Sequence, residues 1–138
     1  MENLRELEYY RFNEPALNGF SKELSNSRDG LHHYRIIEII KMRGAPLEEI
    51  LRANLPRNQV IDFLSIDVEG LDFEVLKSNN WSLFHPKIVL VEMLSGNIYD
   101  FDKNPIAIFM KENGYQLFAK AINTTFFISH EYALERSC

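Results

Sequence analysis

The stretch IDFLSIDVEGLDFEVLKS, residues 61–78, decides the fold expected of this chain. Its apolar first part predicts a strand over Val60–Asp67. Because both faces of that strand are mostly apolar, we expect it to be covered on both sides. The residues from Asp72 to Ser78 then predict a helix. Two acids and a glycine, Asp67, Glu69 and Gly70, therefore occupy the turn between a buried strand and a helix.

Strands and helices alternate along the rest of the chain. From residue 60 the expected order is strand, helix, strand, helix, strand, turn and strand, which predicts an α/β fold with a mostly parallel sheet. A turn at Asn123–Thr124 joins the last two strands, so the sheet should end in a C-terminal antiparallel hairpin. The other predicted elements are strands over Leu4–Phe12, His33–Met42, Lys87–Met93, Tyr115–Ile122 and Thr125–Ser129, helices from Pro46 to Asn54 and from Pro105 to Asn113, and a long loop over 13–30.

Length and composition are typical of one ordinary globular domain. The chain has 138 residues, of which 46% are hydrophobic and 25% charged, and this is enough for a single core. We expect one partial domain over residues 1–138, with an arm and strands in 1–45 and an α/β core in 46–138. The net charge of −5 argues against a nucleic-acid partner. No apolar run reaches the roughly 18 residues of a membrane span, and the single cysteine, Cys138, fits a cytoplasmic location.

Carboxylates gather at one end of the predicted sheet. Glu92 ends the strand that follows Asp67 and Glu69 along the chain, and α/β proteins bind ligands at the carboxyl ends of parallel strands. Acids there could orient a hydroxyl or an amine, hold a hard metal ion, or act as a general base. The alternative is structural, because an acid before a helix often caps it or complements its dipole. Asp72 and Glu74 fit the structural reading, whereas both readings stay open for Asp67 and Glu69.

Other chemistry has little support in the sequence. The four histidines lack the spacing of paired metal ligands, and the acids do not follow the pattern of a calcium-binding loop. We therefore predict no metal-binding residue. Gly70 is placed where a glycine permits a sharp turn with positive φ.

The same residues carry a resemblance to a known family. Residues 61–70, followed by 72–77, resemble the FkbM-type methyltransferases, in which an apolar strand ends in Ile-Asp-Val-Glu-Gly and a helix follows. Pro86–Glu92 is similar to the family's next strand, which ends in glutamate, and Gly114-Tyr115 before the last hairpin also fits. Upstream, Ala45–Leu51 is similar to a helix of the family and Phe12–Ser21 to the arm that precedes it.

The resemblance implies a Rossmann-like, S-adenosylmethionine-dependent methyltransferase that usually methylates a hydroxyl oxygen. It implies that Asp67 and Glu69 are catalytic, orienting the acceptor hydroxyl or taking its proton, with Glu92 as a further candidate. It also implies that Asp67 and Gly70 lie beside the cofactor. The expected acceptor is a hydroxyl of a small molecule or a sugar.

One part of the family's pattern is missing from this sequence. Members normally carry an upstream strand with a glycine-rich turn, roughly Asp-x-Gly-Ala-Asn-x-Gly, and a second strand whose terminal acid binds the ribose. The six glycines of this chain include no closely spaced set after a strand, and such a set lets backbone approach a cofactor closely. We therefore expect a truncated fold that lacks most of the cofactor site and is inactive as this fragment.

The missing first strand also leaves an edge of the sheet without a neighbour. We expect either a second copy of the chain or a missing N-terminal segment to cover the edge of Val60–Asp67. Two rival functions stay open. One is a non-catalytic α/β module that binds a partner, and the other is a metal-assisted hydrolase that uses Asp67, Glu69 and Glu92.

Overall fold

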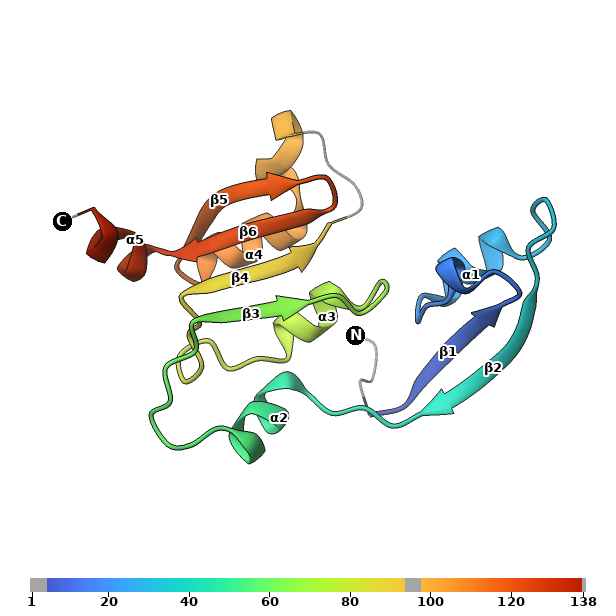
Figure 1. Cartoon of the computed structure of the whole chain (residues 1–138), viewed down its shortest axis with the longest axis horizontal. Coiled ribbons are helices and arrows are strands. Elements are labelled where there is room, and N and C mark those ends of the chain that lie inside the picture. Colours follow the sequence, from blue (N-terminus) through green and yellow to red (C-terminus); the bar gives the residue numbers. More distant parts are fainter. Residues whose placement is uncertain (1–4, 94–97, 138) are drawn as a thin grey trace. The chain divides into compact units, whose positions relative to one another are not determined.

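The computed structural model describes residues 5–93 and 98–137. The chain forms two compact units that interleave along the sequence (Figure 1). The first, called the arm unit, comprises Met1–Ala53 and Asp67–Asn79. The second, called the sheet unit, comprises Asn54–Ile66 and Asn80–Cys138. The division predicted at residue 45 stays a prediction.

A two-stranded hairpin forms the body of the arm unit. The strands β1 (Leu7–Phe12) and β2 (Ile36–Met42) pair antiparallel, and Gly19 bridges to Tyr10 on the other edge of β1. Between the strands lie the short 3-10 helix η1 (Pro15–Leu17) and the helix α1 (Lys22–Arg28). The prediction of a loop over 13–30 was therefore wrong for α1, which begins where the Ser21 hydroxyl accepts a hydrogen bond from the Leu24 N–H.

Two further helices of the arm unit meet end to start. The helix α3 (Asp72–Lys77) buries Leu76 completely. Ser78, the residue that caps the C-terminus of α3, binds the start of α2 (Leu47–Asn54). The Leu47 N–H donates to the Ser78 hydroxyl at 2.9 Å, and the Glu48 N–H donates to the Ser78 carbonyl at 3.2 Å. These bonds satisfy N–H groups that the first turn of a helix leaves open.

The sheet unit contains a four-stranded sheet in the order β3-β4-β6-β5. The strands are β3 (Phe63–Ile66), β4 (Ile88–Glu92), β5 (Tyr115–Ala121) and β6 (Thr124–Ser129). The β3–β4 pair is parallel, while β4–β6 and β5–β6 are antiparallel. The predicted C-terminal antiparallel hairpin is thus confirmed, but the mostly parallel sheet is not, because β6 lies between β4 and β5 and makes two of the three pairings antiparallel. As Figure 1 shows, β3, β4 and β5 still run in one direction and β6 alone runs against them.

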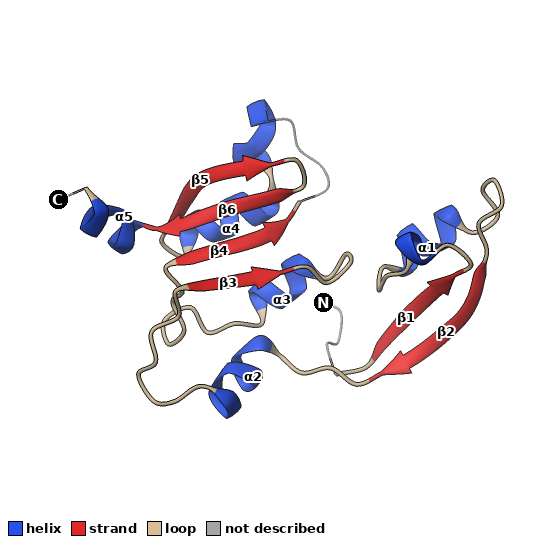
Figure 2. Ribbon diagram, viewed as in Figure 1, coloured by secondary structure: helices blue, strands red, loops and turns tan. Residues whose placement is uncertain are grey.

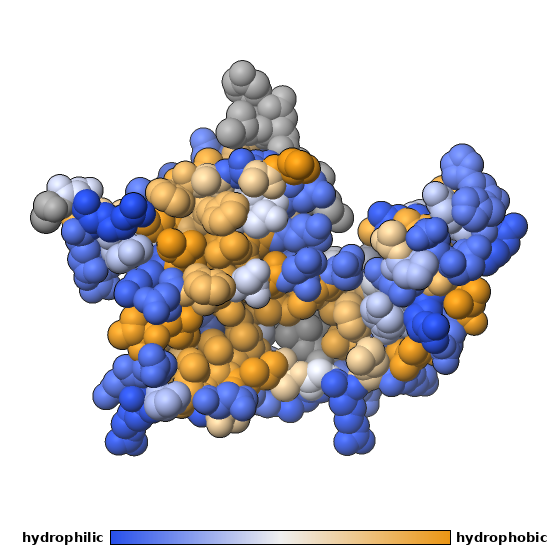
Figure 3. Space-filling view, viewed as in Figure 1, coloured by the Kyte–Doolittle hydropathy of each residue, from blue (hydrophilic) through white to orange (hydrophobic). Residues whose placement is uncertain are grey.

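The two faces of this sheet differ sharply. Helix α4 (Pro105–Glu112) lies behind the sheet in Figure 2, and the core on that side is fully buried, with Val89, Val91 and Met110 at 0% exposure. By register, Phe63, Ile88, Leu90 and Phe126 share the opposite face, where Figure 3 shows hydrophobic residues gathered over the sheet. Phe63 is 66% exposed, so the expectation that its strand is covered on both sides was wrong.

The chain ends in a helix that its sequence did not reveal. The strand β6 gives way to α5 (His130–Arg136), whose start is capped by the Ser129 hydroxyl accepting from the Tyr132 N–H. The start of α4 is capped by the Asn104 side chain, which accepts from the Ile106 N–H at 2.9 Å. A short 3-10 helix, η2 (Ile98–Lys103), precedes α4. Among the described residues, no helix is long and apolar enough to cross a membrane.

Candidate functional site

The residues Asp67–Gly70 form a loop that is held from within by Asp72. One oxygen of the Asp72 carboxylate accepts from the Val68 N–H at 3.4 Å, and the other accepts from the Gly70 N–H at 3.3 Å. Asp72 is the first residue of α3, yet its carboxylate accepts these two bonds from the loop that precedes the helix. Its structural role was predicted, but the group that it stabilises is the turn itself.

The environment of Asp72 opposes its charge. The side chain is buried, at 6% exposure, and this burial raises the pKa of the Asp72 carboxyl above its ordinary value, while the N–H groups of Val68 and Gly70 act in the opposite direction. A buried carboxylate is costly unless it is hydrogen-bonded. The Asp72 carboxylate therefore holds the loop backbone through its hydrogen bonds, and because it is buried it is not available to a ligand.

The backbone of the loop enters the left-handed region at two successive residues. Glu69 has φ +51° and Gly70 has φ +101°. The sharp turn predicted at Gly70 is thus confirmed, and glycine adopts this conformation at little cost. Glu69 is different, because a side chain there costs about 1–2 kcal/mol. Strain of this kind often marks functional sites, although His32, Asn58 and Ile122 also have positive φ, so it does not by itself identify one.

The segment Gly19–Ser21 of the arm unit packs tightly against this loop. The Phe20 N–H donates to the Glu69 carbonyl at 3.2 Å. A side chain at Gly19 would approach that same carbonyl oxygen at 3.1 Å, and one at Gly70 would lie 3.2 Å from Cβ of Ser21. Two segments about 50 residues apart in sequence are therefore shaped to fit each other, and only small residues allow the contact.

The predicted site residues fall into two groups. Asp67 and Glu69 lie on the same loop of the arm unit, and both are exposed. Glu92 is half-buried at the end of β4 in the sheet unit. Ile66 pairs with Val91, so β3 and β4 do end at the same edge of the sheet, as expected of parallel strands. Two cavities of the described residues, one in each unit, are lined by none of Asp67, Glu69, Gly70 and Glu92.

Comparison with known proteins identifies the family. The model of the methyltransferase FkbM domain matches residues 4–117. The chain belongs to the FkbM methyltransferase family. This confirms the resemblance drawn from residues 61–77 and from the similar segments between Phe12 and Tyr115. No curated protein and no solved structure matches the chain.

Membership of the FkbM family suggests S-adenosylmethionine as the methyl donor, but the residues present do not form a cradle for it. The space beside Gly70 that a close-packed cofactor would need is filled by Ser21. Asp67 can accept a hydrogen bond, but its side chain is exposed and lines neither of those two cavities.

Metal binding finds no geometric basis in the part of the chain that the structure describes. Within residues 5–93 and 98–137, no three side chains of His, Cys, Asp or Glu come together in a group that could hold a metal ion. The carboxylates predicted for a metal-assisted hydrolase, Asp67, Glu69 and Glu92, accordingly form no such group.

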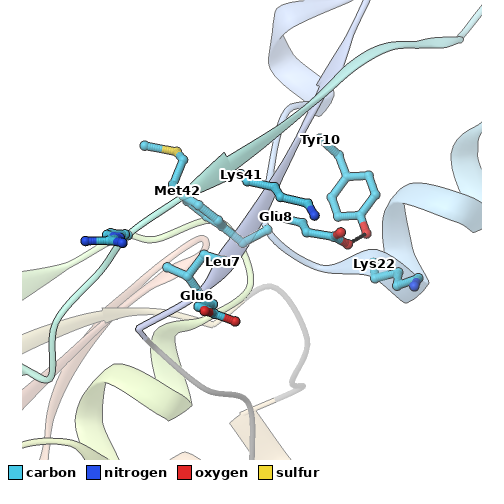
Figure 4. Close-up of a pocket in the computed structure, with 9 residues that line it drawn as sticks. Glu6, Leu7, Glu8, Tyr10, Lys22, Lys41 and Met42 are labelled. Atoms are coloured by element: carbon cyan, nitrogen blue, oxygen red, sulfur yellow. Dashed lines mark hydrogen bonds between the residues drawn. The ribbon is translucent and has the colours of Figure 1, made fainter.

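A cavity in the arm unit has no counterpart in the sequence predictions. It has a volume of about 570 Å³ and lies beside the hairpin (Figure 4). Its lining combines three cations, two acids, a tyrosine and three apolar side chains: Lys22, Lys41, Arg43, Glu6, Glu8, Tyr10, Leu7, Phe20 and Met42. The predicted strands Leu4–Phe12 and His33–Met42 contain six of these nine residues, but nothing in the sequence indicated that α1 folds back beside them.

Proposed function

We propose that this chain supplies the acceptor-orienting part of an S-adenosylmethionine-dependent O-methyltransferase with a Rossmann-like fold. Membership of the FkbM family supports methyl transfer. The observation that carries the proposal is the loop Asp67–Gly70, whose backbone is fixed by Asp72 and by the arm while its two carboxylates remain exposed. A rigid loop that presents free carboxylates is suited to orienting a polar group.

The chemistry assigned to this loop is the handling of a hydroxyl proton. O-methylation removes a proton from the acceptor hydroxyl. A carboxylate that accepts a hydrogen bond from that hydroxyl fixes the direction of its oxygen and takes the proton. We assign this role to Asp67 and Glu69. Glu92 is a further candidate, because it follows Val91, the partner of Ile66 at the same sheet edge.

In this proposal the methyl donor is held by a glycine-rich segment that the present sequence does not contain. Either an N-terminal segment or a second chain would carry it, and it would complete the sheet at the free edge of β3. The chain alone would then be inactive. The acceptor is a small molecule or a sugar with a hydroxyl group. The proposal includes no nucleic acid and no membrane as partner, and the acidic net charge of −5 supports this part of it. The setting proposed is the cytoplasm.

A second candidate is a non-catalytic module that binds a partner through the sheet unit. Its support is the apolar face that carries Phe63, Ile88, Leu90 and Phe126, together with the 66% exposure of Phe63. Exposed apolar patches of this kind mark interaction surfaces. The two candidates differ in whether the carboxylates of the loop matter.

The deciding experiment joins this chain to the glycine-rich half of another FkbM methyltransferase. Titration calorimetry first measures S-adenosylmethionine binding to the chain alone and to the hybrid, with and without Mg²⁺. Transfer of a labelled methyl group to a panel of sugars and other hydroxylated small molecules is then followed for the hybrid. Asp67→Asn and Glu69→Gln are compared with Glu23→Gln, which changes an exposed acid of α1 in the same unit.

We expect the chain alone to bind the donor no more tightly than about 1 mM, and the hybrid to bind it and to transfer methyl groups. Each loop variant should slow transfer about 10²-fold or more, in the range of a lost general base, while Glu23→Gln should not. Unchanged transfer in both loop variants would refute their role. Tight donor binding by the chain alone would refute the need for a further segment, and a requirement for Mg²⁺ would favour metal-assisted chemistry.

A further inference from the structure

We propose that the cavity beside the hairpin of the arm unit binds a small hydroxylated molecule that carries a phosphate or carboxylate group, such as a sugar phosphate or a sugar acid. The volume of about 570 Å³ lies within the range of roughly 300–1,000 Å³ that is usual for small-molecule sites. Leu7, Phe20 and Met42 also line the cavity, although by register Leu7 and Met42 belong to the other face of the hairpin from Glu8 and Lys41.

The charge of the ligand follows from the cations that line the cavity. Lys22, Lys41 and Arg43 all line it, and in the part of the chain that is described none of the three forms an ion pair. By contrast, Arg5, Arg11 and Arg52 of the same unit each pair with a glutamate. Three cations that form no ion pair among the described residues line the cavity together with two acids, Glu6 and Glu8, and this excess of positive charge favours an anionic group, which the cations can bind through charge-assisted hydrogen bonds.

A second feature of the lining, the hydrogen bond between Tyr10 and Glu8, indicates that the ligand carries hydroxyl groups. Tyr10 is only 1% exposed, and its phenol donates to a carboxylate oxygen of Glu8 at 2.7 Å. This bond fixes the Glu8 carboxylate, which retains acceptor sites for further donors. The Glu8 carboxylate can accept hydrogen bonds from hydroxyl groups, which bring no second negative charge near it. A bare anion would meet Glu8 as a repulsive neighbour, so the hydroxyls are a necessary part of the ligand.

The hairpin register brings these opposite charges together. Glu8 of β1 pairs directly with Lys41 of β2, so their side chains project from the same face of the hairpin. Figure 4 shows the Glu8–Tyr10 hydrogen bond between Lys41 on one side and Lys22 on the other. The anion would lie at the lysines, and the hydroxylated part would lie at Glu8.

The cavity shares a segment with the candidate site. Phe20 lines the cavity, and its N–H donates to the Glu69 carbonyl at 3.2 Å. A ligand in the cavity would therefore contact the stretch that packs on the Asp67–Gly70 loop. Naming this ligand as the methyl acceptor rests on the proposed function, whereas its binding to the cavity does not.

Binding to the complete chain tests the proposal without any methyl donor present. Titration calorimetry would use glucose 6-phosphate, glucuronate, glucose and inorganic phosphate as probes. We expect glucose 6-phosphate or glucuronate to bind at least about tenfold more tightly than either glucose or phosphate, because only the first two carry both recognised groups. Which of the two binds better distinguishes a phosphate from a carboxylate ligand.

Three variants locate the site. Lys41→Gln and Lys22→Gln should each weaken the better probe about five- to tenfold, as expected for the loss of one charge-assisted hydrogen bond at an accessible site. Lys120→Gln is the matched control, because Lys120 also lies on a strand and forms no ion pair among the described residues, but belongs to the sheet unit. It should leave binding unchanged. Circular dichroism and thermal unfolding establish that each variant is folded.

A salt series on the unmodified chain does not depend on any variant folding. Raising the ionic strength from about 0.05 M to about 0.5 M should weaken binding of the anionic probes several-fold, because accessible charges are screened. The proposal is overturned if no probe saturates at about 10 mM, if glucose or phosphate binds as tightly as the anionic sugars, if Lys120→Gln matches the other variants, or if salt has no effect. A methyl-transferring hybrid whose chain binds none of the probes would overturn this proposal alone. Probe binding without transfer would leave it standing.

Discussion

The loop over Asp67–Gly70 and the strand β3 that leads into it differ in how many of their groups find partners within this chain. Four backbone groups of the loop find partners inside the arm unit: two N–H groups at Asp72, the Glu69 carbonyl at Phe20 and the Val68 carbonyl at Leu71. In the described structure β3 pairs on one edge only, with β4, and its Phe63 is 66% exposed. The loop is therefore specified by residues of this chain, while β3 has the properties of a strand that needs a further neighbour.

The same contrast divides the two faces of the four-stranded sheet. Toward α4 the side chains are fully buried, and on the opposite face apolar residues remain accessible. A complete α/β fold covers both faces of its sheet. The stability of the sheet unit should therefore come almost entirely from one face, and this can be measured with neighbouring residues of a single strand.

Phe127 and Phe126 make that measurement, and the effect expected is the largest. Phe127 is 1% exposed on the α4 side, so Phe127→Ala should lower the free energy of unfolding by about 3–5 kcal/mol. Phe126 is half-buried on the other face, so Phe126→Ala should cost about 1 kcal/mol. Urea unfolding of both variants gives the comparison, and equal losses would mean that something covers the second face in solution.

Phe63 tests whether the exposed edge and face are used by a second copy. If they are, light scattering should show an average mass that falls toward the monomer on dilution. Phe63→Glu should then weaken association at least about tenfold, the loss expected for a central apolar contact. Ile122→Glu is the control, since Ile122 is 90% exposed at the turn between β5 and β6. A monomer at every concentration whose β3 amides resist hydrogen exchange would argue against an open edge.

Gly70 tests how firmly the loop is held by the arm. Gly70→Ala meets two penalties, a positive φ of +101° and a methyl group 3.2 Å from Cβ of Ser21. Gly30→Ala meets only the first, because Gly30 has φ +90° and its nearest neighbour is a flexible arginine tip 4.0 Å away. We expect losses of about 2–3 kcal/mol and about 1 kcal/mol in unfolding free energy. Equal losses would show that the backbone around Ser21 moves aside without any loss of unfolding free energy.

The sequence predicts strands and helices well where a single local pattern dominates. The helix α4 was found because Asn104 and Pro105 form a start signal and Gly114 a stop signal. The helices α1 and α5 were missed, although Ser21 and Ser129 cap them, because both begin in or near stretches whose polar or strand-like composition outweighed a single serine. Strand lengths were less predictable: the eight-residue run Val60–Asp67 yields the four-residue strand β3, because pairing with β4, not hydrophobicity, sets its ends.

The site shows the same limit more clearly. Position alone identified Asp67, Glu69 and Gly70, since they follow an apolar strand directly. It could not show that Gly19 and Phe20 close over the loop, because that contact joins segments about 50 residues apart. Nor could it show the cavity beside the hairpin, which depends on where α1 folds back. Periodicity describes neighbours along the chain and carries no information on such distant contacts.

Asp72 offers the smallest but most specific test of how the loop is held. Burial raises the pKa of its carboxyl in the folded protein, so the folded state binds the proton more strongly than the unfolded state does. The contribution of Asp72 to stability is then greatest below its unfolded pKa and falls as the pH rises toward the folded pKa. Asp72→Asn has no such titration, and its single amide oxygen can still accept from one of the two loop N–H groups.

The two proteins should therefore diverge in a defined direction. Between pH 7 and pH 4, the unfolding free energy of the unmodified chain should rise relative to that of Asp72→Asn, measured with urea at each pH and the same ionic strength. Asp62→Asn serves as the comparison, because Asp62 is an exposed acid paired with Lys87 and should not reproduce this trend. A difference that moves the opposite way would mean that the N–H groups of Val68 and Gly70 outweigh burial, and that Asp72 holds the loop as a fully charged acceptor.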